Sequence, residues 1–487
     1  MLWRDLRDYL NTLDRLGELK RVNGAGWEED IGGITELMVE RRGPALLFDE
    51  IRDYPKGYRV AANLFNTVKR TGIAFGLELE PGATSLAERA AKVMAEFRPV
   101  APEEVSSGPI LENILKDDAI DLYRFPTPKW HENDGGRYIG TGCCVIQKDP
   151  DNGFVNVGAY RVAIHDRKTC ALFIEHGKHG DVIRRKYWAR GKKCPVVVSV
   201  GQEPILPVLA GSRFFYSPEG VSELEVAGYL HKSPYPIVRG EFTGLPIPAF
   251  GEIAIEGFIP SADEVMVPEG PFGEWTGYYA HGRRPETIIE VKAIYHRNDP
   301  IIFGAPPSRP IGGDYFAILG NEDLDSMAQL KRAGIRGVKG IFTLAKPRLR
   351  VLGLKQMYAG HVDDVIRVLV PGGEQYSGNH IWILVDDDID ITNTEEVLWA
   401  LATRCIPEHA VKVIPGTAVW QLDPRIPPED RSSPDKAGRK RYSAHNLVIN
   451  ACRPYEWLND FPPVAVNSPE LRQRIATKWK DLFEEII

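Results

Sequence analysis

Two glutamates stand close together in the segment PEGPFGEW, which covers residues 268–275. Glu269 and Glu274 are five positions apart, and the glycines and prolines around them argue against a regular helix. When two carboxylates are held together away from water, their pKa values move apart, so that one stays ionised and the other carries a proton. Phe272 and Trp275 would supply the apolar side chains that exclude water from such a pair. The alternative is two solvated glutamates on a surface turn.

A guanidinium that could pair with an ionised carboxylate comes from the segment NVGAYR, residues 156–161. On one extended strand, Asn156, Gly158 and Tyr160 share a face and Arg161 points to the other. An arginine in an apolar strand is costly unless it is paired. Arg161 is therefore either the partner of the two acids or a solvated residue on an edge strand.

Candidate metal ligands occur in two further segments. His176 and His179 are three positions apart in IEHGKHG, a spacing that also arises by chance in a chain with 11 histidines. Glu223 and Glu225 lie two positions apart on the helix predicted over residues 219–232, so only one of them can face inward. A solvated helical face is the alternative for both glutamates.

The segment VDDDIDITN, residues 385–393, places acids after the apolar run IWIL. It predicts either a magnesium site or a strand end followed by a helix cap from Thr392 or Asn393, and the sequence favours the cap. Lys355 follows another strand and is either a phosphate contact or a solvated lysine. The chain has no P-loop, no GxSxG, no HExxH and no GxGxxG that opens a helix.

Composition limits the class of protein. The chain has 487 residues, of which 43% are hydrophobic and 26% charged, and its net charge of -7 does not indicate nucleic-acid binding. The charged N-terminus is not typical of a signal peptide, and no apolar run reaches the ~18 residues of a membrane span. Six cysteines without a CxxC pair predict free thiols in the cytoplasm.

The elements that must position these residues fall into three sections. Leu6, Leu10 and Leu13 predict an amphipathic first helix, which is followed by short strands and a helix at 85–97 in a small α/β domain. A middle section of apolar or alternating runs, separated by Gly, Pro, Asn and Asp, predicts a barrel or sandwich.

The third section begins near residue 315 and alternates helices with strands, which is typical of a sheet with crossover helices. The segment 436–440 is expected to be an exposed loop. A last helix begins with Ser468 as cap and Pro469 in the first turn, and it carries a stripe of Leu471, Ile475, Trp479 and Phe483. This stripe must dock either on its own domain or on a neighbouring subunit.

Taken together, these motifs resemble the UbiD family of prenylated-flavin-dependent decarboxylases. The resemblance runs in order from DLRDYL, GELKRV and GPALLF through NVGAYR, SELEVAG, EIAIEG and EGPFGE to KQMYAGH and VDDDIDITN. It implies an α/β (α+β) fold with an N-terminal α/β domain over 1–108. A central split β-barrel of flavin-reductase type would bind the cofactor over 109–312, and a C-terminal α/β domain with a terminal oligomerisation helix would cover 313–487.

The resemblance implies a catalytic set of Arg161, Glu269 and Glu274, in which Arg161 pairs with Glu269 and Glu274 is the proton donor. Trp275 would shape the substrate pocket or serve as scaffold. The residues implied in cofactor binding are Asn156, Val157, Gly158, Ala159, Tyr160, Arg161, Lys178, His179, Glu223 and Lys355.

The resemblance also implies a metal site formed by Asn156, His179 and Glu223, with His176 as the alternative to His179 and with Glu223 fitting better than Glu225. An amide oxygen, an imidazole and a carboxylate suit Mn²⁺ or Mg²⁺ rather than a thiophilic ion. The metal would bridge the protein to the cofactor phosphate, and K⁺ would be a second ion.

Loss of carbon dioxide from an aromatic or vinyl carbon leaves an unstabilised carbanion, so a cofactor must take up the electrons. The resemblance implies prenylated FMN in that role, and reversible decarboxylation of an aromatic, heteroaromatic or α,β-unsaturated acid. It implies a homo-oligomer, a dimer or a hexamer, that receives its cofactor from a flavin prenyltransferase. Two other hypotheses stay open: a flavin-dependent oxidoreductase on the same barrel, and a non-catalytic flavin carrier or assembly protein.

Overall fold

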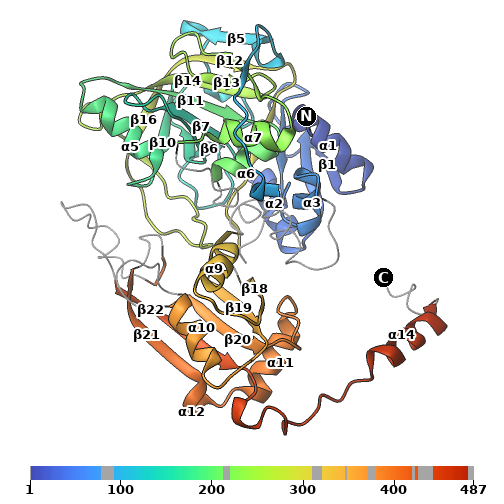
Figure 1. The fold of residues 1–487 in the computed structure, drawn as a ribbon. Coiled ribbons are helices and arrows are strands. Elements are labelled where there is room, and N and C mark those ends of the chain that lie inside the picture. The colour runs from blue at the N-terminus through green and yellow to red at the C-terminus, as the bar shows by residue number, and fades with distance from the viewer. Residues whose placement is uncertain are drawn as a thin grey trace.

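The computed structural model describes residues 2–77, 93–211, 220–309, 321–345, 348–370, 380–418, 423–425 and 443–480. Figure 1 shows an upper body made of the N-terminal and central parts of the chain, and a C-terminal domain below it. No helix in these ranges is both long enough and apolar enough to cross a membrane.

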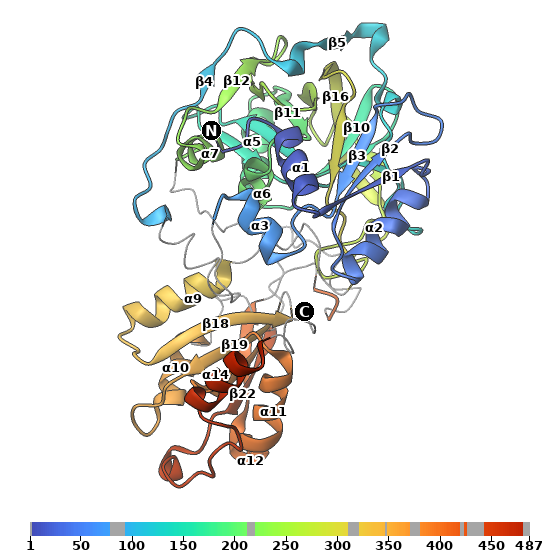
Figure 2. The same cartoon turned by 90° about the vertical axis from the view of Figure 1, so that its right-hand side faces the viewer.

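The N-terminal part forms a four-stranded sheet whose last strand comes from much later in the chain. The sheet order is β1 (Leu19–Asn23), β2 (Ala45–Asp49), β3 (Arg59–Ala62) and β17 (Ile301–Gly304), and β17 runs parallel to β3. Figure 2 shows this sheet with its helices α1 (Leu6–Arg15), α2 (Asp30–Glu40) and α3 (Val68–Ala74). The predicted first helix is confirmed, since Asp5 caps α1 and its leucine face is buried.

The central part is built on a ten-stranded sheet that forms a half-barrel. Its main order is β6 (Arg137–Gly140), β9 (Arg161–Ile164), β10 (Thr169–Phe173), β16 (Arg284–His296), β14 (Ile253–Ile259), β11 (Cys194–Val200), β7 (Cys144–Lys148) and β8 (Val155–Gly158). β15 (Val267–Glu269) and β5 (Asn113–Lys116) also pair with β16. A small sheet joins β13 (Pro246–Pro248), β12 (Pro236–Arg239) and β4 (Glu103–Glu104), and the helices are α5 (His179–Trp188), α6 (Ile205–Gly211) and α7 (Glu223–His231).

The C-terminal domain has a five-stranded mixed sheet in the order β18 (Val338–Ala345), β19 (Leu349–Leu354), β20 (Ile381–Asp386), β22 (Ser443–Ala451) and β21 (Val411–Ala418). Helices α9 (Asn321–Arg332), α10 (His361–Leu369), α11 (Thr394–Arg404) and α12 (Pro407–Ala410) accompany it. The parallel pairs β19–β20 and β20–β22 confirm the predicted crossover pattern.

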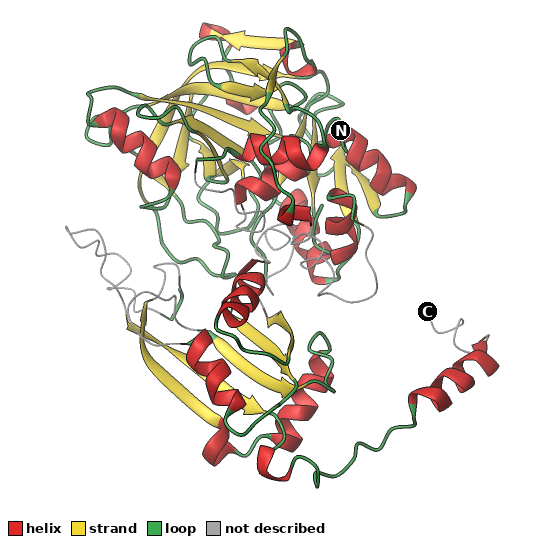
Figure 3. Ribbon diagram, viewed as in Figure 1, coloured by secondary structure: helices red, strands yellow, loops and turns green. Residues whose placement is uncertain are grey.

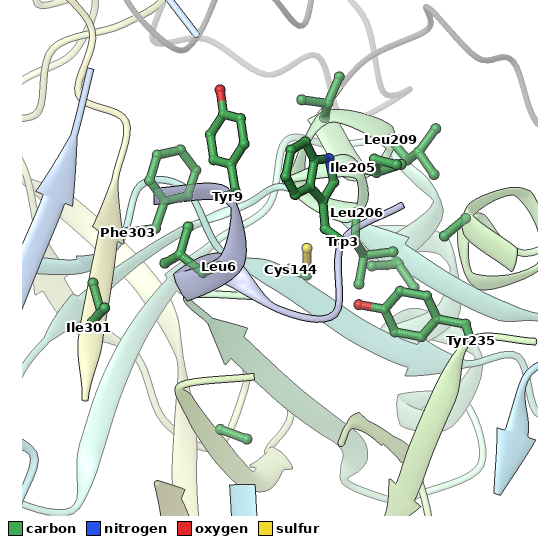
Figure 4. Close-up of a cluster of buried hydrophobic side chains, with 14 of the residues drawn as sticks. Trp3, Leu6, Tyr9, Cys144, Ile205, Leu206, Leu209, Tyr235, Ile301 and Phe303 are labelled. Atoms are coloured by element: carbon green, nitrogen blue, oxygen red, sulfur yellow. The ribbon is translucent and has the colours of Figure 1, made fainter. Parts of the chain in front are cut away.

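The first hydrophobic core joins the N-terminal helix to the central half-barrel, as Figure 4 shows. Trp3, Leu6 and Tyr9 pack with the α6 side chains Ile205 and Leu206, and each of these five is buried. Burying a large apolar side chain contributes about 1.5–3 kcal/mol. The shared core therefore fixes the N-terminal sheet firmly on the half-barrel that carries the site.

Some predicted elements lie partly or wholly outside the described residues. The helix predicted over 85–97 lies mostly outside the described residues, and so do the loop at 436–440 and Phe483. The last helix, α14 (Pro469–Lys478), has the predicted Ser468 cap, and Figure 3 shows it standing away from both bodies. None of its described residues is buried, so the first of the two alternatives, docking on its own domain, is not seen there.

Candidate active site and cofactor site

Arg161 joins the two glutamates of the opening motif. Its guanidinium donates to both oxygens of Glu269, Nε at 2.9 Å and Nη2 at 2.8 Å, and its Nη1 donates to Glu274 at 2.9 Å. The side chains of Glu269 and Glu274 are only 2% and 8% exposed. The solvated alternatives for Arg161 and for the two glutamates are therefore wrong, although the catalytic role of the three residues stays a prediction.

Strand register explains why these side chains meet. The expectation of one strand through residues 156–161 is wrong, because β8 ends at Gly158 and β9 begins at Arg161. Arg161 lies directly opposite Phe173 on β10, and Tyr138 on β6 lies opposite Ala163, two positions beyond Arg161. Successive side chains alternate between faces, so Tyr138, Arg161 and Phe173 project from the same face of the sheet.

The loop after β15 brings the glutamates to this face. Gly270 has a φ of +84°, a left-handed conformation that glycine adopts without strain. Gly135 packs so closely that a Cβ on it would lie 1.9 Å from the carbonyl oxygen of Gly270, and its N–H donates to the Pro271 carbonyl at 2.7 Å. Gly135 and Gly270 therefore allow two segments of backbone to approach each other closely.

Aromatic rings surround the guanidinium. The Cζ atom of Arg161 lies 4.5 Å from the ring centroid of Phe173 and 5.1 Å from that of Phe272. Phe272 packs on Tyr138 with the centroids 4.1 Å apart, and Trp275 is 8% exposed. The predicted apolar side chains are present beside the pair, and cation–π attraction to two rings helps to hold the arginine in place.

Burial and charge act in opposite directions on the carboxyl group of Glu274. Burial raises its pKa above the ordinary value, and the positive charge and hydrogen bond of Arg161 only partly offset that effect. Burial alone would lower the pKa of Arg161, but the charges of Glu274 and Glu269 raise it above its usual range. Glu274 is thus a carboxyl group that keeps its proton to higher pH than an ordinary glutamate, beside a permanent cation.

Glu223 is another acid with a raised pKa, and its side chain is half-buried. It opens α7 and accepts the backbone N–H of Val157 at 2.8 Å. Burial raises its pKa to about 7, and among the described residues no lysine, arginine or histidine forms an ion pair with it. Glu225 instead forms a capping box with Ser222, which is a structural role. Glu223 is therefore the candidate functional residue of the two.

The two histidines differ in what they contact. His176 has its Nδ1 atom 2.9 Å from the buried carboxylate of Asp181. His179 is exposed at the first residue of α5 and makes an edge contact with the Phe154 ring, with the centroids 6.0 Å apart. Both histidines are exposed, but Nδ1 of His176 is engaged by Asp181, which favours His179 as a ligand; the choice between them stays a prediction.

Strand β8 lies between the first turns of α5 and α7. The Gly180 N–H of α5 donates to the Tyr160 hydroxyl at 3.0 Å, and Gln147, which pairs with Asn156 across the sheet, donates to the Gly180 carbonyl at 3.4 Å. Asn156, 2% exposed, sits beside Val157, which binds Glu223. The structure thus collects Asn156, His179 and Glu223 on three neighbouring elements.

The remaining predicted cofactor residues are distributed along these elements. Val157 and Gly158 end β8, and Ala159 donates to the Ala210 carbonyl of α6 at 3.0 Å. Lys178 precedes α5 and lies 3.8 Å from a Glu175 carboxylate oxygen. Lys355 is exposed just after β19 in the C-terminal domain, and none of its described contacts joins it to the other predicted residues.

The acidic segment after β20 is structural. Asn393 caps α11, accepting from the N–H groups of Glu395 and Glu396, which confirms the favoured interpretation. Asp386 is buried and accepts from Gln356 at 2.9 Å and Arg404 at 3.0 Å. Sequence reasoning missed Tyr138 and Phe173, which contact the arginine–glutamate cluster, because single aromatic residues in alternating strands carry no distinguishing signal.

Comparison with known proteins accounts for all three parts of the chain. Models of the 3-octaprenyl-4-hydroxybenzoate carboxy-lyase N-terminal, Rift-related and C-terminal domains match residues 10–90, 103–310 and 319–451. The chain belongs to the UbiD family. It is an enzyme of the carboxy-lyase class.

Curated UbiD relatives match over almost their full length. The chain is 30% identical to the pyrrole-2-carboxylic acid decarboxylase of Pseudomonas aeruginosa over 98% of each chain. It is 31% identical to a phenolic acid decarboxylase of Bacillus subtilis over 93% of each.

Solved UbiD-class structures share the fold. The enzyme HmfF from Pelotomaculum thermopropionicum, in complex with FMN, is 25% identical with a TM-score of 0.81, over 96% of this chain and 98% of that one. The vanillic acid decarboxylase of Sedimentibacter hydroxybenzoicus in its open form is 26% identical with a TM-score of 0.83, over 99% of each chain. The mixed α/β fold with a half-barrel sheet is thereby confirmed.

Proposed function

We propose that this UbiD-family carboxy-lyase catalyses reversible, non-oxidative decarboxylation of an aromatic, heteroaromatic or α,β-unsaturated carboxylic acid with prenylated FMN. The observation that carries the proposal is the buried bridge of Arg161 between Glu269 and Glu274. Relatives named as decarboxylases of pyrrole-2-carboxylic acid, phenolic acids and vanillic acid support the substrate class. Neighbouring structures with FMN and with prenylated FMN support the cofactor.

The reaction breaks the bond between the substrate carbon and its carboxylate, and it releases carbon dioxide while the electron pair stays on the carbon. The prenylated flavin supplies the electron sink that no side chain of this chain could provide. Glu274 then gives its proton to the carbon, which forms the new C–H bond. Its raised pKa keeps that proton available, and return of a solvent proton restores the acid.

Arg161 and Glu269 position the acid. Three hydrogen bonds fix the guanidinium, and the rings of Phe173 and Phe272 limit its movement. Because these rings also exclude water, the charges in the site are weakly screened. In the reverse direction the same carboxylate, Glu274, would accept the proton when carbon dioxide adds to the carbon.

The cofactor would bind along the β8–β9 segment, from Asn156 through Val157, Gly158, Ala159 and Tyr160 to Arg161. Lys178 and His179 at the start of α5, Glu223 of α7, and Lys355 complete the proposed set. Asn156, His179 and Glu223 fit a Mn²⁺ or Mg²⁺ ion that joins the cofactor phosphate to the protein, with K⁺ as a second ion. The pKa of about 7 at Glu223 supports this site, because a divalent cation would offset the cost of burying its charge.

We further propose that the enzyme is a homo-oligomer, a dimer or a hexamer, that is supplied by a flavin prenyltransferase. The exposed stripe of α14, with Ile475 at 40% and Trp479 at 52%, supports contact with another subunit.

The test is coexpression with a flavin prenyltransferase, followed by an absorption spectrum and intact mass of the released ligand. A flavin heavier than FMN by a prenyl group is expected, together with carbon dioxide release or deuterium exchange on aromatic acids. Glu274→Gln should lower both activities by about 10²–10⁴-fold, whereas Glu290→Gln, which alters a β16 glutamate paired with Lys193, should not. Plain FMN with activity that survives Glu274→Gln would indicate an oxidoreductase, and no bound chromophore would indicate the non-catalytic alternative.

A further inference from the structure

Glu269 and Glu274 share the guanidinium of Arg161 unequally. Glu269 accepts from Nε on one oxygen and from Nη2 on the other, whereas among the described residues Glu274 accepts a single side-chain hydrogen bond, from Nη1. A third donor increases the difference, because the hydroxyl of Tyr138 donates to Oε1 of Glu269 at 2.9 Å. Hydrogen bonds that a carboxylate accepts favour its ionised form.

The fold holds the Tyr138 hydroxyl in this direction. The side chain is 1% exposed, and its ring packs on Phe272 with the centroids 4.1 Å apart. A second acceptor, the carbonyl oxygen of Pro271, lies farther away at 3.4 Å. The single hydroxyl hydrogen is therefore directed at Glu269.

We propose that Tyr138 is a positioning residue that keeps Glu269 ionised, so that the one proton of the carboxylate pair resides on Glu274. The inference rests on the proposed function, in which Glu274 delivers that proton to the substrate carbon. Without the hydroxyl, the two carboxyl groups would become more alike in their affinity for the proton. A larger fraction of the protein would then carry the proton on Glu269, which does not donate a proton in the proposed reaction.

Other charged groups face this cluster from neighbouring elements. Arg284 of β16 lies opposite Glu269 in the sheet and pairs with Glu286 at 2.7 Å, and its Cζ lies 4.5 Å from the Phe173 ring centroid. Asp134 accepts the Tyr279 hydroxyl at 3.0 Å and lies 3.6 Å from His131. Within the described part of the chain, none of these groups hydrogen-bonds to Glu269, so removing the Tyr138 hydroxyl leaves their contacts in place.

The first test is an infrared pH titration of the cofactor-free protein, following protonated carboxyl bands in wild type and Tyr138→Phe. Glu269→Gln and Glu274→Gln assign the bands. Because a hydrogen bond to a charged group is involved, we expect the ionisation of Glu269 to move to higher pH by about 1–2 units in Tyr138→Phe. Tyr279→Phe is the matched control and should leave it in place. A shift smaller than about 0.3 units in Tyr138→Phe would overturn the proposal.

The second test uses the pH profile of decarboxylation by the flavin-loaded enzyme. The acidic limb should move to higher pH in Tyr138→Phe by the amount seen in the infrared titration. In a Glu269→Gln background, Tyr138→Phe should cause no further change, because the group through which it acts is absent. An equal loss of rate in both backgrounds would show that Tyr138 acts elsewhere, and the proposal would fail.

The two tests separate this inference from the proposed function. If no acid is turned over, the infrared titration still shows whether Tyr138 determines which carboxyl group is protonated. Should Tyr138→Phe fail to fold, 3-fluorotyrosine placed at position 138 provides a more acidic phenol and a stronger donor. It should move the ionisation of Glu269 to lower pH, and an unchanged or raised value would contradict the inference.

Discussion

Replacing Arg161 with glutamine should destabilise the protein in a strongly pH-dependent way. The guanidinium makes three hydrogen bonds of 2.8–2.9 Å to two glutamates whose side chains are 2% and 8% exposed. Removing one partner of a buried ion pair costs about 3–5 kcal/mol, because the remaining charge stays buried without compensation. We expect a loss in this range at pH 8 for Arg161→Gln.

The sign of the pH dependence follows from Glu274. Burial already raises its pKa in the folded protein, and loss of the Arg161 charge would raise it further. A carboxyl group whose pKa is higher in the folded than in the unfolded state costs nothing below its unfolded pKa of about 4.3. Its full cost is reached only above the folded pKa. The loss of stability in Arg161→Gln should therefore be small near pH 5 and grow towards pH 8.

The assay is urea unfolding of wild type and variant at pH 5, 6.5 and 8, monitored by tryptophan fluorescence. Arg239→Gln is a matched control, because Arg239 pairs with Glu104 at the surface, where both side chains are about half exposed. A surface pair of this kind contributes roughly 0–1 kcal/mol. A pH-independent difference for Arg161→Gln, or a loss below about 1 kcal/mol at pH 8, would refute the reasoning.

Three other predictions follow from the site and the core. Because the carboxyl group of Glu223 has a pKa of about 7, its contribution to the stability of the metal-free protein should be lost as the pH rises through 7. Added Mn²⁺ should therefore raise the melting temperature more at pH 8 than at pH 6. Glu223→Gln should abolish that increase, whereas Glu225→Gln should keep it, because a glutamine can still accept the capping hydrogen bond. Equal metal responses would argue against the site. Glu274→Gln should lower turnover by about 10²–10⁴-fold, and a normal rate would exclude Glu274 as the proton donor. Leu6→Ala, at a side chain that is 1% exposed, should cost about 2–5 kcal/mol in denaturant unfolding, while Leu16→Ala, at a side chain that is 51% exposed, should cost far less.

Elements with strong periodicity could be predicted from the sequence. The first helix, the half-barrel strands and the crossover pattern of the C-terminal sheet follow from regular spacing of apolar residues. The Asn393 cap followed from local chemistry, because its side chain bonds to N–H groups two and three positions along the chain. Such features depend on neighbours in sequence, which a single sequence displays directly.

Contacts across the sheet could not be predicted in the same way. Tyr138 is 131 positions from Glu269, and their hydrogen bond depends on the register of strands that the sequence does not state. The break between β8 and β9 was missed because NVGAYR has the alternation of one continuous strand. Residue chemistry left the pairing of Arg161 with the two acids as one of two alternatives, since an apolar strand with one arginine also fits an exposed edge. Only the family resemblance singled out Glu269 as its partner.

The strand β17 gives the protein an order of assembly during synthesis. The N-terminal sheet lacks its last strand until residues 301–304 have left the ribosome, which at ~5–20 residues per second takes on the order of ten seconds or more after β3 emerges. In that interval β3 presents an open sheet edge, a surface that other chains can pair with. A chain truncated before residue 301 would keep that edge permanently. The first hundred residues are therefore better regarded as a part whose sheet is completed only by β17 than as a unit that can be expressed alone.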